Sequence, residues 1–107
     1  MEMMELAENI GLDVEDFSEI FEIYLETTSS YLGELKTALQ EGDMQAVHEK
    51  AHSIKGASGN LGLNELYELA IDIDDQVRGD STDGLESLVE KFTKKYEELV
   101  EDFQRSI

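Results

Sequence analysis

The chain of 107 residues contains neither proline nor cysteine. Proline is the residue that most strongly interrupts helices, so its absence favours long uninterrupted ones. Without cysteine the protein can form no disulfide, no thiolate metal site and no thiol redox centre. The composition therefore fits a reducing compartment and excludes several classes of chemistry at once.

Long apolar runs are missing as well. No segment approaches the roughly 18 apolar residues that a membrane-spanning helix needs, and none has the basic-then-apolar order of a signal peptide. The length suits one small domain over residues 1–107. We therefore expect a cytoplasmic protein that does not associate with membranes.

Basic residues are scarce. The chain has 8 of them against 26 acidic residues, which leaves a net charge of −18. Nucleic acids and anionic membrane surfaces repel such a chain, so we exclude both as partners. Most of the acidic residues serve solubility. A functional role for the few bases would require the fold to gather them at one place.

Apolar residues recur at alternating steps of three and four in four segments, which is the pattern of amphipathic helices. The expected helices cover approximately residues 13–41, 43–61, 64–78 and 83–105, and residues 2–8 are compatible with a short additional helix. Suitable N-caps and stops are Asp13, Asp43, Asn64, Gly42 and Gly62. Short connections between such helices favour an all-α fold, an antiparallel four-helix bundle.

The second of these helices presents two different faces. Its apolar stripe consists of Met44, Val47, Ala51, Ile54, Ser58 and Leu61. At about 100° per residue, His52 points well away from the middle of that stripe. Four residues fall within about 40° of His52, namely Gln45, His48, Gly56 and Gly59. We therefore expect His52 to be exposed to solvent and not buried in the core.

Two glycines on the exposed side of a helix need an explanation. Each costs about 0.5–1 kcal/mol relative to alanine, and Gly56 and Gly59 do not face the expected core. Glycine leaves clearance for another molecule beside His52, and Lys55 supplies a cation one turn away. Together these features suit transfer of a phosphoryl group from a docked partner. Taken singly, tolerated glycines and an ordinary solvated lysine remain alternatives.

The same stretch contains a competing pattern. HEKAH matches the H-E-x-x-H motif of zinc proteases, with His48 and His52 as ligands and Glu49 as the general base. A catalytic zinc needs a third protein ligand, and Glu68 or Asp72 would have to serve. Among 26 acidic residues such a match arises by chance. We therefore predict no metal site and keep a zinc hydrolase only as a remote alternative.

The stretch AHSIKGASGNLG, residues 51–62, resembles the signature of histidine-containing phosphotransfer (HPt) domains, in which an AHxxKG core precedes small residues and LG. The long preceding helix, the acidic turn at Gly42 and Asp43 and the two following helices fit that family over nearly the whole chain. The resemblance implies a four-helix bundle with an exposed phosphorylatable histidine. That histidine would exchange a phosphoryl group with the aspartate of a response-regulator receiver domain, or take one from a kinase domain.

The resemblance also implies roles for individual residues. His52 would carry the phosphoryl group on Nε2, Lys55 would neutralise it, and Gly56, with Gly59, would let the receiver dock closely. Asp74 stands where the family often has Glu or Gln, and it would fix the tautomer of His52 if it reached Nδ1.

The remaining candidates surround this centre. Arg78 matches a position that is often basic in the family, with an intrahelical pair to Asp74 as the alternative. Gln45 and His48 are candidates for the neighbouring docking surface. We also hypothesise that Lys50, Lys55 and Arg78 gather near His52 and favour the phosphoryl group there.

We therefore predict a phosphorelay intermediate, a covalent carrier and not a kinase, because the chain lacks a Gly-rich phosphate loop. Its partners would be a receiver domain, a sensor histidine kinase, or both. It would need no cofactor, since Mg²⁺ is expected on the receiver only. We expect a monomer, and the initial Met1 favours a free-standing protein. The alternative is a non-catalytic helical interaction module.

Overall fold

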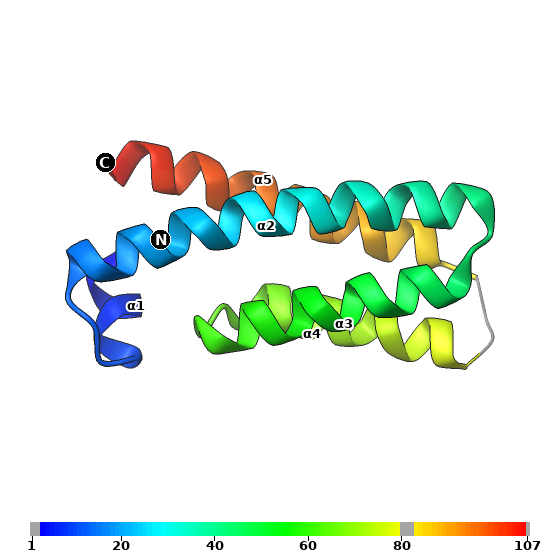
Figure 1. Ribbon diagram of the computed structural model, residues 1–107, viewed down its shortest axis with the longest axis horizontal. Helices are drawn as coiled ribbons and strands as arrows, with labels where there is room; N and C mark the ends of the chain where they lie inside the picture. The colour runs from blue at the N-terminus through cyan, green and yellow to red at the C-terminus, as the bar shows by residue number, and fades with distance from the viewer. Residues whose placement is uncertain (1–2, 80–82, 107) are drawn as a thin grey trace.

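The computed structural model describes residues 3–79 and 83–106, and this part of the chain contains five α-helices (Figure 1). They are α1 (Met3–Asn9), α2 (Val14–Glu41), α3 (Met44–Asn60), α4 (Asn64–Arg78) and α5 (Leu85–Ser106). No strand occurs in the described residues. The all-α prediction and the short leading helix are confirmed.

The four long helices run in alternating directions and form the predicted antiparallel bundle (Figure 1). Helix α3 packs between α2 and α4, and α4 also packs against α5. The short helix α1 contacts α2 and lies at the end of the bundle where α2 begins. Among the described helices, none is both long and apolar enough to cross a membrane.

Local signals explain most of the helix ends. The side chain of Asp13 accepts a hydrogen bond from the backbone N–H of Asp16 at 2.8 Å, and Asp43 accepts one from Ala46 at 3.2 Å. Both N-cap predictions are therefore confirmed. Gly42 closes α2 with φ 74°, a left-handed conformation that glycine adopts without steric cost.

The predicted range of α4, residues 64–78, is confirmed, but its predicted N-cap and the predicted start of α5 are wrong. Asn64 is the first helical residue of α4 and not its cap, which is Leu63 without a side-chain hydrogen bond. Helix α5 begins at Leu85 and not near residue 83, because Gly84 has φ 78° and cannot belong to a right-handed helix. The sequence would also suit a start as early as Ser81, which lies outside the described residues.

Helix α3 buries the stripe that its sequence predicts. Five of the six stripe residues are buried and the sixth, Met44, is half-buried; the buried ones are Val47, Ala51, Ile54, Ser58 and Leu61. Ser58 is the polar member, and its hydroxyl shares a 2.8 Å hydrogen bond with the hydroxyl of Tyr24 on α2. Because this stripe faces α2 and α4, the opposite face of α3 is left to solvent.

Candidate functional site

His52 lies midway along α3 and its side chain is exposed. Within residues 3–79 and 83–106 it forms no hydrogen bond and no ion pair. Its neighbour one turn earlier is His48, whose ring centroid lies 6.1 Å away with 32° between the ring planes. Lys55, one turn later, is half-buried and has no ion-pair partner in the described part of the chain. Both groups are therefore available to an incoming anion.

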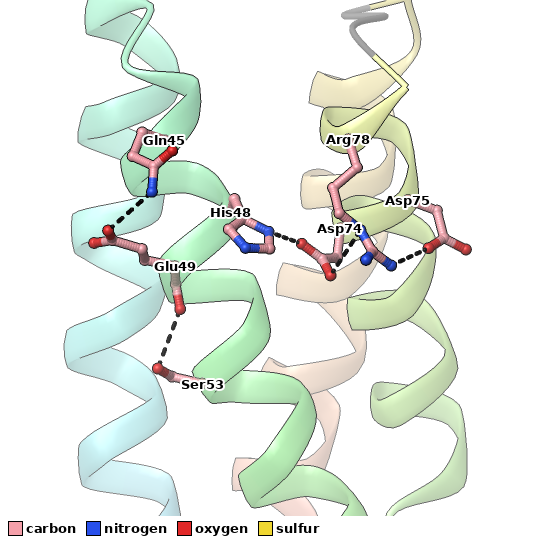
Figure 2. A network of polar contacts seen from close by, with 7 residues as sticks. All are labelled: Gln45, His48, Glu49, Ser53, Asp74, Asp75 and Arg78. Carbon is pink, nitrogen blue, oxygen red and sulfur yellow. Dashed lines mark hydrogen bonds and ion pairs between the residues drawn. The ribbon is translucent and has the colours of Figure 1, made fainter.

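A polar network joins α3 to α4 beside this histidine (Figure 2). Nδ1 of His48 contacts Oδ1 of Asp74, whose side chain is only 2 % exposed. The second oxygen of Asp74, Oδ2, lies 3.6 Å from Nε of Arg78, which is also 3.1 Å from Asp75 through Nη2. A buried carboxylate needs such partners, and here each of its two oxygens faces one.

Asp74 is therefore directed at His48 and not at His52. The sequence left open whether its short side chain reaches His52 Nδ1, and the structure shows its carboxylate engaged elsewhere. The alternative for Arg78, an intrahelical pair with Asp74, is the contact found.

The predicted gathering of bases around His52 is wrong for Lys50. Its ammonium lies 2.7 Å from Glu34 on α2 and sits over the ring of Tyr31, 5.4 Å from the centroid. The hydrogen bond to Glu34 raises the pKa of Lys50 above its ordinary value. Lys50 precedes His52 by two residues, which corresponds to a rotation of about 200° around the helix axis. The two side chains therefore point in different directions. Gln45 is also engaged locally, donating to Glu49 at 3.2 Å.

The two glycines have different surroundings. Gly56 is exposed, and a Cβ built on it would meet no heavy atom within 4 Å outside its own stretch of helix. A Cβ on Gly59 would lie 3.0 Å from both Cδ1 and Cε1 of Tyr67 on α4. Packing within the bundle therefore does explain Gly59, contrary to the prediction, because this glycine makes room for the Tyr67 ring.

The difference between the glycines can be measured as stability. Gly56→Ala is expected to stabilise the protein by about 0.5–1 kcal/mol, the helix propensity gained over glycine. Gly59→Ala is expected to gain less, because the new methyl group crowds Tyr67. In a Tyr67→Ala background the two substitutions should become alike. Urea unfolding of the four Gly59–Tyr67 combinations gives the coupling, for which about 0.5–1 kcal/mol is expected; additive effects would contradict this role of Gly59.

Within the described residues, the zinc hydrolase alternative lacks a third metal ligand. In the described residues, no group of three or more His, Cys, Asp and Glu side chains is arranged to hold a metal ion. Glu68 and Asp72 thus form no such group with His48 and His52. A catalytic zinc site needs three protein ligands, so HEKAH here has the spacing of the motif without its coordination sphere.

The burial of Asp74 is a feature that the sequence pattern indicates. Asp74 follows Ile73 on α4 and precedes Val77, so it lies at the edge of an apolar stripe that otherwise faces the core. A carboxylate in such a place requires a partner from a neighbouring helix. Both histidines of α3 are candidates for that partner. Which of them contacts Asp74 depends on how α3 and α4 are packed against each other.

Comparison with known proteins agrees with this geometry. Residues 19–105 match the Hpt domain family. The crystal structure of histidine-containing phosphotransfer protein B from Pseudomonas aeruginosa PAO1 superimposes with a TM-score of 0.83 at 23% sequence identity, covering 97% of this chain and 88% of that one. At this identity the likeness establishes the fold. A search of curated proteins found no match.

The family match covers all of α3, with its exposed histidine, and all of α4, together with most of α2 and α5. It therefore covers both the bundle and the signature around His52 on which the resemblance depended. The chain belongs to the Hpt domain family and is a histidine phosphotransfer protein of phosphorelay signalling.

Proposed function

We propose that His52 is the residue that carries the phosphoryl group, on Nε2, between receiver aspartates or from a kinase domain to a receiver. The observation that supports this most directly is the state of its side chain. His52 is exposed midway along α3 and has no hydrogen-bond or ion-pair partner in the described residues. His48, the other histidine of the chain, is already bound to Asp74.

The transfer step needs only correct placement and charge compensation. The lone pair on Nε2 of His52 attacks the phosphorus of an aspartyl phosphate on the receiver. The N–P bond forms as the bond between phosphorus and the aspartyl oxygen breaks, and the aspartate leaves as a carboxylate. His52 keeps the proton on Nδ1, so no proton has to move during transfer. The reverse sequence hands the group to a receiver aspartate.

The neighbours of His52 serve this step. Lys55 lies one turn away without an ion-pair partner in the described chain, and its ammonium can approach the dianionic phosphoryl group. Gly56 leaves the helix surface open where the receiver docks. The domain acts as a cytoplasmic monomer, binds no cofactor of its own, and meets the Mg²⁺ held by the receiver.

The direct test mixes the protein with a phosphorylated receiver and follows the label. Phosphate should move onto this chain in a linkage that acid hydrolyses and base does not, which distinguishes phosphohistidine from phosphoserine and aspartyl phosphate. Failure to accept phosphate from any receiver or sensor kinase tested would refute the proposal and leave the helical interaction module. A base-labile linkage would also refute it.

Two lysines on α3 form a matched pair for testing charge compensation. Lys55→Ala is expected to slow transfer about 5- to 10-fold, because an exposed charge interaction is worth about 1 kcal/mol. Lys50→Ala should leave the rate unchanged, since Lys50 is paired with Glu34 on α2. Single-turnover transfer from a phosphorylated receiver gives both rates. Equal effects of the two substitutions would show that overall charge matters and the position of Lys55 does not.

A further inference from the structure

The buried Asp74 and the half-buried His48 form a pair that has no part in the proposed transfer step. Asp74 is 2 % exposed and meets a partner through each carboxylate oxygen, His48 through Oδ1 and Arg78 through Oδ2. His48 is half-buried between α3 and α4, with its Nδ1 turned toward Asp74 (Figure 2). His48 lies one turn before His52 on α3, so the pair can act on that residue.

The contact with Asp74 selects the tautomer of His48. A carboxylate only accepts hydrogen bonds, so Nδ1 of His48 must carry the proton and donate it. In the neutral ring the other nitrogen, Nε2, is then an acceptor. Among the described residues nothing occupies this nitrogen. The nearest imidazole is that of His52, at the 6.1 Å centroid separation already described.

We propose that Asp74 fixes the reactive tautomer of His52 indirectly, through His48. In this relay Nε2 of His48 accepts the Nδ1–H of His52, which leaves Nε2 of His52 unprotonated and nucleophilic. His48 and Asp74 are thus positioning residues for the transfer, and the inference rests on the proposed role of His52.

The geometry brings the two rings close to bonding distance. An N–H···N bond of ordinary length between two imidazoles places their centroids about 5–5.5 Å apart, and the rings here are separated by 6.1 Å. Because His52 is exposed and unbonded within the described residues, rotation of its side chain can close this gap. His48, held by Asp74, remains in place as the fixed partner.

The relay also stabilises the product. Once Nε2 is phosphorylated, the imidazole of His52 bears positive charge and its Nδ1–H becomes a stronger donor. His48 accepts that bond, while the carboxylate of Asp74 balances the charge shared between the rings, as in other carboxylate–histidine pairs. Arg78 orients the second oxygen of Asp74. No proton leaves the protein during the step.

Three variants test the relay. His48→Phe keeps an aromatic ring but removes both nitrogens, whereas His48→Gln keeps a donor for Asp74 and an acceptor for His52. Asp74→Asn keeps the shape and removes the charge. We expect His48→Phe to slow transfer from a phosphorylated receiver about 10-fold, as loss of a supporting hydrogen bond does elsewhere. Asp74→Asn should slow it in the same direction, and His48→Gln should restore most of the rate.

A spectroscopic readout separates this role from a purely structural one. Two-bond ¹H–¹⁵N correlation spectra of the unphosphorylated protein should show His52 mainly as the Nδ1–H tautomer, and His48→Phe should shift it toward the Nε2–H form. An unchanged His52 tautomer in both His48→Phe and Asp74→Asn would overturn the relay. A rate loss in Asp74→Asn but not in His48→Phe would overturn it too, because Asp74 would then act directly. If phosphate is accepted without His52, the proposed function itself fails.

Discussion

Replacing His52 with glutamine is expected to reduce phosphate incorporation to background. The amide nitrogen of glutamine has no free lone pair for attack on phosphorus, whereas a neutral imidazole has one. The loss should not come from unfolding, because His52 is exposed and forms no hydrogen bond or ion pair within the described chain. A surface substitution of this kind changes stability by about 0.5 kcal/mol or less. Incorporation from a phosphorylated receiver and thermal unfolding are the two measurements.

Ser53→Ala provides the matched control for this variant. Ser53 is the next residue and is exposed, and within the described residues its hydroxyl donates to the backbone carbonyl of Glu49 on its own helix, 3.1 Å away, and to no other group. The substitution should leave incorporation intact. Phosphate retained by His52→Gln and lost from Ser53→Ala would place the acceptor at the hydroxyl and contradict the prediction.

Gly56→Gln is expected to lower the rate of transfer about 100-fold, the effect of displacing reacting groups by about 1 Å. The fold should tolerate the substitution, because no heavy atom beyond its own stretch of helix lies within 4 Å of the Cβ position. Glutamine is also a better helix former than glycine. The variant should therefore be as stable as the parent or more so, yet keep the receiver from approaching His52.

Gly56→Ala at the same position separates clearance from helix flexibility. Alanine adds one methyl group but stiffens the helix as glutamine does. If clearance is what matters, alanine should reduce the rate far less than glutamine. The measurements are single-turnover rates at several receiver concentrations, where weakened docking raises the half-saturating concentration. Equal losses in the two variants would instead assign the effect to stiffening of α3.

Much of the fold was predictable because its signals are local. The helix boundaries at Asp13, Gly42 and Asp43 depend on side chains and backbone angles within a few residues of each end. The start of α5 was predicted wrongly, and the reason is again a feature close to the helix end. Gly84 takes a left-handed conformation and delays α5 to Leu85, although the residues before it would suit a helix start.

The immediate surroundings of His52 were less predictable. Nothing in the spacing shows that Lys50 turns to Glu34 on α2, that Tyr67 on α4 covers Gly59, or that Asp74 meets His48. Each contact joins two helices that are separated in sequence. Such contacts depend on the axial register and rotation of the packed helices, which the interlocking of many core side chains decides together.

The exposed face of α3 could be predicted from the sequence alone, with His52 at its centre, Lys55 one turn later and Gly56 beside it. This follows from the 3.6-residue period and the apolar stripe opposite, both properties of a single segment. Which charged groups share that face depends instead on how the helices pack against one another. Lys50 turns away from this face to pair with Glu34, and the buried Asp74 contacts His48. Both contacts result from the packing of α2, α3 and α4, which orients the side chains between them.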